Sequence, residues 1–179
     1  DSLVDWIDGD TQLSGSNGAE DPDYQGLPKP YLAANSLLLD VSELRMIRGY
    51  SREVVRKLRP YVCVIPNETA LMINVNTLKD EQAALLTAVT EGKMSLQDAQ
   101  SFLSNRPEAG YESNEEVDEV EAIANVKSEL NGELSELDVE SEYFQLTAYI
   151  QWGDVEMKAR SVLHVNNGEV ATLYRAMGE

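Results

Sequence analysis

The chain has 179 residues and a mass of 19.9 kDa, which suits one sizeable domain or two small ones. It carries 32 acidic and 14 basic residues, for a net charge of −18 at pH 7. This charge disfavours binding to nucleic acid phosphates and anionic membranes, and it attracts cations. No apolar run approaches the ~18 residues that span a bilayer. Because the sequence opens at Asp1 without a signal peptide, we expect an excised or processed fragment.

A single Cys and a single His exclude several kinds of chemistry. Zinc sites need more Cys and His ligands than Cys63 and His164 supply. His164 lies in the apparent strand 161–165 without recognisable triad partners, so we expect an ordinary strand residue. Cys63 lies in the apolar run 61–65 and is expected to be buried, with pairing to a Cys outside this sequence as the alternative. We therefore predict no catalytic residues and no enzyme activity.

The first 30 residues are rich in Gly, Asn, Ser and Pro, with seven acids and no base before Lys29. Such a composition predicts turns, and we assign residues 1–30 to an acidic loop. Residues 36–59 then show two short helical patterns with apolar positions at helical spacing. Gly49 should end the first helix, and Ser51 should cap the second, which ends before Pro60.

Residues 74–106 repeat this layout, so the sequence predicts two helical hairpins in tandem within a helical domain over 31–137. Thr77 and Asp80 have the spacing of a capping box, and Ser95 has the position of a further cap. Residues 112–142 hold twelve acids and one base, Lys127, which is typical of a solvated acidic helix or linker. The spacing of Leu130, Leu134 and Leu137 favours a helix packed on one side.

The hydrophobic period changes to two after residue 141, which predicts strands over 143–152, 155–165 and 169–174. Gly153-Asp154 and Asn166-Asn-Gly168 are turn signals, so the strands should form an antiparallel meander over 138–179. Helices followed by strands predict the α+β fold class rather than alternating α/β.

The first 21 residues contain the strongest candidate for a binding site. Acidic and amide side chains recur there at alternate positions around a Gly, which lets their oxygens converge on one point, as Ca²⁺ requires. The candidate ligands are Asp8, Asp10, Gln12 and Glu20, with Asp5 and Asp21 as further candidates. The spacing is not that of an EF-hand, and a solvated Asx-turn loop remains the structural alternative. A glycosidase-like carboxylate pair is a weaker alternative because nothing else indicates a sugar cleft.

Two further patterns are candidates for partner surfaces. Arginines recur at spacings of three and four on one predicted helical face, which fits either an exposed face that offsets nearby acids or a docking surface for an acidic partner. They are Arg45, Arg48, Arg52, Arg56 and Arg59. The hairpin over 74–111 is similar to a helix-hairpin-helix unit, but it lacks an evident Gly-rich turn that would present backbone N–H groups to phosphate.

A set of motifs occurs in the order that is characteristic of one known family. They are Asp5-Trp-Ile-Asp8, Gly18-Ala-Glu20, Tyr31, Asn35, Ser42-Glu43-Leu44-Arg45, Gly49, Leu58-Arg-Pro-Tyr61, Pro66, Asn74-Val-Asn-Thr77, Arg106-Pro107 and Ser141-x-Tyr143-Phe144. Over nearly the whole chain, this order resembles the GspK family, the large minor pseudopilin of the bacterial type II secretion system. A departure is Pro28-Lys29-Pro30, where the family more often has adjacent prolines. The N-terminal hydrophobic helix and the first strands of the pilin-like part are absent.

The resemblance implies an inserted all-helical, SAM-like domain followed by the β-meander of a pilin-like fold. It also implies a non-catalytic tip subunit of the periplasmic pseudopilus of a Gram-negative bacterium, anchored in the inner membrane when full length. The implied partners are the minor pseudopilins of the I and J types, with the major pseudopilin and secreted proteins as further candidates. Nucleic acid is not expected, and membrane contact is expected only through the missing N-terminal helix. The resemblance further implies calcium binding near the helical domain.

Two other functions remain alternatives at this point. One is a periplasmic helix-hairpin-helix protein that binds DNA in an uptake system, which the charge of −18 disfavours. The other is a calcium-dependent hydrolase, which the lack of a nucleophile-base set disfavours.

Overall fold

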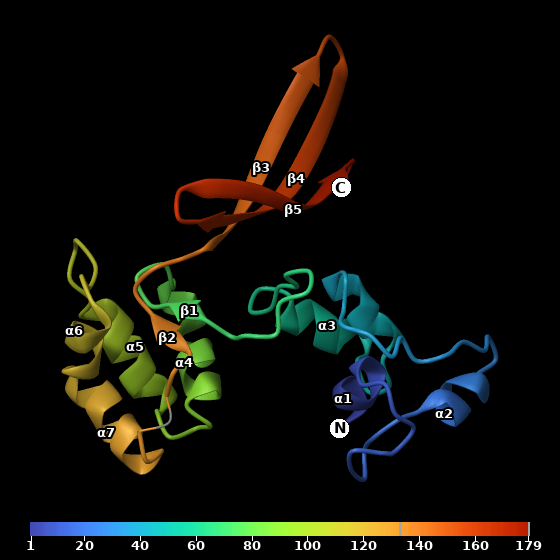
Figure 1. Ribbon diagram of the computed structural model, residues 1–179, viewed down its shortest axis with the longest axis horizontal. Helices are drawn as coiled ribbons and strands as arrows, with labels where there is room; N and C mark the ends of the chain where they lie inside the picture. The colour runs from blue at the N-terminus through green and yellow to red at the C-terminus, as the bar shows by residue number, and fades with distance from the viewer. Residues whose placement is uncertain (133, 179) are drawn as a thin grey trace. The chain divides into compact units, whose positions relative to one another are not determined.

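The computed structural model describes residues 1–132 and 134–178, and the chain divides into two compact units, Asp1–Glu68 and Thr69–Glu179 (Figure 1). This division falls inside the helical domain predicted over 31–137, and residues 1–30 pack with 31–68 in one unit. Among the described residues, no helix combines the length and the hydropathy that crossing a membrane requires.

The first unit contains three α-helices and one 3-10 helix, in part where the sequence predicted only loop. The elements are α1 (Ser2–Ile7), α2 (Asp21–Gln25), the 3-10 helix η1 (Val41–Met46) and α3 (Arg52–Leu58). The prediction of a purely loop-like segment over 1–30 is therefore wrong. Leu3, Trp6 and Ile7 are spaced three and four apart, and this face of α1 packs into the core. The buried core residues are Trp6, Ala19, Tyr24, Ala33, Leu44, Ile47 and Val55.

The helix boundaries of the first unit follow local hydrogen bonding. The Ser51 hydroxyl accepts the N–H of Val54 at 3.3 Å and caps α3, and Gly49 has φ +87°, as the predicted cap and stop require. The first helix predicted within residues 36–59 is shorter than expected. Asp40 caps η1 by accepting the Ser42 N–H at 2.8 Å, so the helical turn begins only at residue 41.

The prediction that Cys63 is buried is wrong. Cys63 is exposed and has no disulfide partner among the described residues. Its neighbours Tyr61 and Val62 are 36% and 38% exposed, so this apolar run follows the surface of the first unit. Hydrophobic side chains often remain on a protein surface, because polar area is insufficient to cover it.

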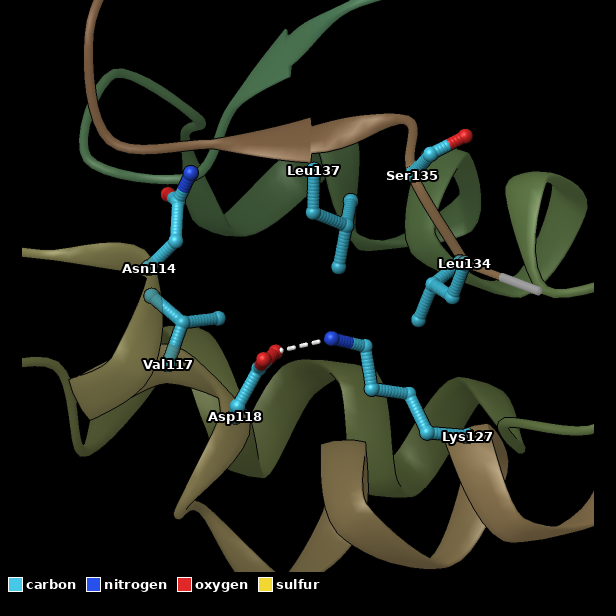
Figure 2. Close-up of a pocket in the computed structure, with 7 residues that line it drawn as sticks. All are labelled: Asn114, Val117, Asp118, Lys127, Leu134, Ser135 and Leu137. Atoms are coloured by element: carbon cyan, nitrogen blue, oxygen red, sulfur yellow. Dashed lines mark hydrogen bonds and ion pairs between the residues drawn. The ribbon is translucent and has the colours of Figure 1, made fainter. Parts of the chain in front are cut away.

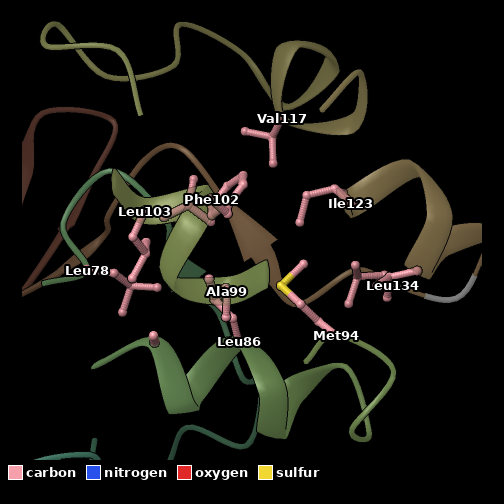
Figure 3. Packing of buried hydrophobic residues seen from close by; sticks show 12 residues of the cluster. Leu78, Leu86, Met94, Ala99, Phe102, Leu103, Val117, Ile123 and Leu134 are labelled. Carbon is pink, nitrogen blue, oxygen red and sulfur yellow. The ribbon is translucent and has the colours of Figure 1, made fainter. Parts of the chain in front are cut away.

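The helical part of the second unit is built from two hairpins and a short strand pair. Its elements are the strand β1 (Ile73–Asn74), the 3-10 helix η2 (Asp80–Gln82), α4 (Ala83–Val89), α5 (Leu96–Ser104), α6 (Asn114–Asp118), α7 (Glu121–Glu129) and the strand β2 (Leu137–Asp138). β1 and β2 pair in parallel. Figure 3 shows the apolar side chains that meet between the helices, among them Leu86, Met94, Phe102 and Ile123. Apolar burial therefore connects α4 and α5 to the acidic segment.

Of the two helix caps predicted for this part, one is confirmed and the other is wrong. Ser95 caps α5: its hydroxyl accepts the Asp98 N–H at 3.1 Å and donates to the Asp98 carboxylate at 2.6 Å. The predicted capping box of Thr77 and Asp80 is wrong, because the Thr77 hydroxyl donates to the carbonyl of Asn74 at 3.0 Å instead. The helical turns consequently begin only at residue 80, after a turn closed by that hydrogen bond.

The acidic segment over 112–142 belongs to the helical core, because Val117, Ile123 and Val126 are buried while most of the acids face outward. The expected continuous helix through Leu137 is wrong. Backbone φ becomes positive at Asn131 and Gly132, which ends α7. Leu134 is buried after this turn, and Leu137 belongs to β2.

Three long strands form the C-terminal sheet in the order β3 (Tyr143–Trp152), β4 (Val155–Asn166) and β5 (Glu169–Met177). Both pairings are antiparallel, so the predicted meander and the α+β class are confirmed. Gly153 has positive φ in the first turn, as Asn167 and Gly168 have in the second. His164 lies in β4 as expected, and its ring stacks on Tyr143 with centroids 4.7 Å apart.

Candidate metal centre

Three carboxylates converge where α1 leads into the following loop. Asp8 is the C-terminal cap of α1, Asp10 follows two residues later, and Glu20 is the N-terminal cap of α2. One carboxylate oxygen from each residue lies within 4.8 Å of the corresponding atoms of the other two. Two oxygens bound to one Ca²⁺ at about 2.3–2.6 Å can be at most roughly 5 Å apart, so this spacing fits a shared cation.

Two oxygens of this cluster are buried without a hydrogen-bond donor. They are Oδ1 of Asp8 and Oε1 of Glu20, and the Glu20 side chain as a whole is nearly inaccessible. Burial raises the pKa of Glu20, and the neighbouring acids Asp5, Asp8, Asp10 and Asp21 raise it further. An ionised carboxylate in such a place is unfavourable unless it meets a positive charge. The arrangement therefore has the chemistry of a site for a hard cation.

Asp5 organises the loop around the cluster. Its Oδ1 accepts the N–H of Ser14 at 2.9 Å, and its Oδ2 accepts the N–H of Ala19 at 2.8 Å. Hydrogen bonding from the Ser14 side chain, followed by these backbone donors, lowers the pKa of Asp5 although burial opposes this. A Cβ on Gly18 would lie 2.2 Å from Oδ2 of Asp5, so this contact requires glycine. Asp5 thus shapes the loop and lies outside the converging set.

The other two sequence candidates have different surroundings. Oδ1 of Asp21 accepts the N–H of Ala33 at 2.9 Å, which ties the start of α2 to the irregular segment that follows this helix. Gln12 is exposed, and its backbone N–H donates to Oδ1 of Asp10 at 2.7 Å. Of the five candidates with a carboxylate, the converging set contains Asp8, Asp10 and Glu20, and the side-chain amide of Gln12 stays a candidate ligand.

Sequence reasoning missed the part played by Asp23. Its Oδ2 accepts the N–H of Glu20 at 3.2 Å, and its Oδ1 lies 2.9 Å from a guanidinium nitrogen of Arg48. The same guanidinium donates to the carbonyl of Gly18 at 3.3 Å. Asp23 and Arg48 thereby hold the loop and the start of α2 together. The only sequence signal was a Pro in the first turn of α2 followed by an acid at the third helical position.

A second concave site of about 150 Å³ lies between α6, α7 and β2 (Figure 2). Lys127 reaches across it and donates to the Asp118 carboxylate at 2.5 Å. The rest of the wall is formed by apolar side chains such as Leu134 and Leu137 and by the polar residues Asn114 and Ser135. Because Lys127 and Asp118 compensate each other's charge in this pocket, neither side chain is available as an acid, a base or a nucleophile.

Comparisons with known proteins give a consistent result. Two family models, both described as "Type II secretion system (T2SS), protein K", match residues 1–67 and residues 73–140. The chain is 41% identical over 162 residues to type II secretion system protein K of Aeromonas hydrophila, covering 90% of this chain and 48% of that protein. It is 36% identical over 177 residues to protein K of Pectobacterium carotovorum subsp. carotovorum, covering 99% of this chain and 53% of that protein.

A solved structure agrees with the sequence relatives. The crystal structure of the GspK-GspI-GspJ complex from enterotoxigenic Escherichia coli contains a chain that superposes with a TM-score of 0.84. Sequence identity to it is 31%, and the match covers 99% of this chain and 61% of that one. The chain spans about half the length of the two curated relatives, 48% and 53%.

Proposed function

The chain belongs to the type II secretion system protein K family, and we propose that it is part of a non-catalytic minor pseudopilin at the tip of the pseudopilus. In this role it assembles with partners of the I and J types in the periplasm, and the full-length protein is anchored in the inner membrane. The structural neighbour was crystallised in a GspK-GspI-GspJ complex, which supports this choice of partners.

The observation that carries the assembly role is an uncovered apolar face on the C-terminal sheet. Alternate residues of β3 and their partners on β4 point to this face: Phe144, Leu146, Ile150, Trp152, Val155 and Met157. Trp152 is 85% exposed and Leu146 is 53% exposed. Apolar patches of this kind mark interaction sites, and Trp is prominent among residues that dominate binding energy.

The opposite face of the same strands is mainly polar. It carries Gln145, Thr147, Gln151, Glu156 and Lys158, and Tyr149 is an aromatic residue on this face that is 80% exposed. The alternation along β3 thus gives the sheet one mainly polar face and one apolar face, and the apolar face is the one expected to be buried in the assembled state. We assign the apolar face to packing against the I and J partners and the N-terminal helix of the full-length protein.

Sedimentation velocity of the full-length periplasmic domain with the I- and J-type partners tests this assignment. We expect a one-to-one-to-one complex at micromolar concentration. The double variant Leu146→Asp/Ile150→Asp should abolish it, while the matched Thr147→Asp/Gln151→Asp on the polar face should retain it. A stable homopolymer, or equal loss in both variants, would contradict the assignment.

We further propose that Asp8, Asp10 and Glu20 hold a calcium ion that stabilises the first unit. The supporting observation is the pair of buried oxygens on Asp8 and Glu20 that accept no hydrogen bond. The ion would supply the positive charge that these carboxylates lack, and backbone carbonyls or water would complete the six to eight oxygens that Ca²⁺ takes. The site residues themselves bind and orient; none of them has a catalytic role here.

Isothermal titration with calcium chloride, with magnesium chloride as a second arm, tests the calcium site. Asp10→Asn should weaken calcium binding at least tenfold, since it removes a charge but keeps an oxygen that accepts the Gln12 N–H. The matched control is Asp154→Asn, an exposed acid in the turn between β3 and β4. No heat of binding with the unmodified chain, or equal affinity in both variants, would refute the proposal.

A further inference from the structure

One side of α3 carries three arginines at helical spacing. Arg52, Arg56 and Arg59 are separated by four and three residues, and all three are exposed. Val55, three residues after Arg52 and four before Arg59, is buried along one edge of this side, where it anchors α3 to the first unit. Glu53 and Lys57 form a separate ion pair at 2.9 Å on another side. The three arginines therefore form a face of their own, called the arginine face below.

The arginine face has no acidic partner within the described residues. The guanidinium groups of Arg52, Arg56 and Arg59 form no ion pair or hydrogen bond there, and neither does that of the exposed Arg45 on η1, an element that contacts α3. Arg48, by contrast, is held by Asp23 and the carbonyl of Gly18. Like charges at this spacing destabilise a helix. Unpaired guanidinium groups are unexpected in a chain that has 32 acidic residues available.

The surroundings of this face concentrate positive charge. Residues 45–59 hold six of the 14 basic residues and one of the 32 acids, so this segment has a net charge of +5 in a chain of −18. Met46, Val54 and Tyr61 add exposed apolar surface nearby. Arg, Met and Tyr are enriched at protein interfaces, where Lys is depleted. The composition is that of a protein-binding surface.

We propose that the arginine face, together with Arg45, docks an acidic segment of another protein. Guanidinium groups bind carboxylates through two parallel hydrogen bonds, and carboxylates spaced three and four apart on a helix would match the spacing on α3. Because α3 is about 10 Å long, a short segment covers it. Duplex DNA and anionic membranes are larger than this face. The net negative charge of the rest of the chain would repel the parts of them that extend past it. This inference goes beyond the pseudopilin role and does not depend on it.

Fluorescence anisotropy with the whole chain tests the proposal. The probe is a labelled 20-residue helical peptide rich in Glu and Leu, with Glu at positions spaced three and four apart. We expect saturable binding that weakens steeply with added salt. Arg52→Gln/Arg56→Gln/Arg59→Gln should reduce affinity at least tenfold. The control Lys29→Gln/Lys57→Gln/Lys158→Gln removes the same charge elsewhere, with Lys57 on the same helix, and should change affinity less than twofold.

Three outcomes would overturn the proposal. The first is no binding of the acidic peptide at low salt, and the second is equal loss of affinity in the two triple variants. The third is tighter binding of phosphatidylglycerol vesicles or duplex DNA than of the peptide, which would assign the face to lipid or nucleic acid. Circular dichroism of the arginine variant establishes that it remains folded, and the single variant Arg56→Gln provides a milder perturbation with the same expected direction.

Discussion

The first unit and the helical part of the second unit differ in what they bury. The helical part buries aliphatic side chains such as Leu86, Met94 and Ile123, and Thr90 is its only buried polar residue within the described range. The first unit has a smaller aromatic core around Trp6 and Tyr24, and it also buries the carboxylates of Asp5 and Glu20. Its stability therefore depends on hydrogen bonds to these carboxylates in addition to apolar area, and the proposed calcium ion would add to it. The two regions should respond to different perturbations.

The largest expected effect is a cavity in the aliphatic core. Leu86 is fully buried, so Leu86→Ala should lower the free energy of unfolding by about 2–5 kcal/mol. Leu96→Ala, at a position 49% exposed on α5, should cost far less. Chemical denaturation monitored by circular dichroism in EDTA and in calcium measures both. If the loss of unfolding free energy caused by Leu86→Ala differed between EDTA and calcium, the two regions would not respond independently.

Removing calcium should affect the first unit alone. If free calcium is at 100 times its Kd, EDTA should lower protection of the amides around α1 and α2 about 100-fold, equivalent to about 2.7 kcal/mol. Amides in α4 and α5 should not change, because those helices contain no part of the cluster. Hydrogen exchange with mass spectrometry resolves the two regions. Uniform loss of protection across both would show that the ion does not act locally.

A substitution in the loop between α1 and α2 should lower the stability of the first unit by an intermediate amount. Gly18→Ala places a Cβ 2.2 Å from Oδ2 of Asp5, so the loop must shift at a cost of about 1–3 kcal/mol. Calcium affinity should fall as well, since the loop leads into Glu20. Gly9→Ala is the matched control, because a Cβ there meets nothing within 4 Å. Thermal melting and calcium titration of both variants give the comparison, and identical behaviour would argue against the tight contact.

The smallest expected effect is on the pH dependence of the calcium-free protein. The pKa of Glu20 is raised by burial, so its stabilising contribution is present below the unfolded pKa of about 4.3 and is lost as pH rises through the folded pKa. The pKa of Asp5 is lowered by hydrogen bonding, so its contribution is present above about 3.9 and is lost as pH falls through the folded value. The two contributions oppose each other.

In EDTA, the first unit should therefore become less stable as pH rises from about 4.5 toward neutrality. Glu20→Gln should flatten this trend, because the amide does not ionise. With calcium present the trend should reverse, since the ion binds the ionised carboxylates. Urea denaturation midpoints at several pH values measure this. A Glu20→Gln variant that keeps the full slope would place its origin elsewhere in the acidic chain.

Strong local periodicity is what made part of the fold predictable. The alternation from Tyr143 onward and the Gly-containing turns specify β3, β4 and β5, because each strand pairs with its neighbour through a short turn. The helices α4 and α5 follow from apolar spacing and the Ser95 cap. Asp8 and Asp10 of the candidate metal centre could be named from their alternate spacing around Gly9, and Glu20 as an acid that could return to them from further along the loop. For the helix caps and the turns, the deciding interactions lie within a few residues of one another.

What the sequence alone could not decide depends on contacts between distant residues. Asp5 and Asp8 are equivalent as acids in sequence, yet Asp5 is committed to the N–H groups of Ser14 and Ala19, while Asp8 has a buried oxygen without a donor. Trp6 of helix α1 is buried against Tyr24, with ring centroids 5.2 Å apart, although the composition of residues 1–30 as a whole favours turns. Cys63 stays exposed because its apolar run does not reach a core. The chain's residues determine which groups are available, and tertiary packing decides which of them lose water and thereby acquire a function.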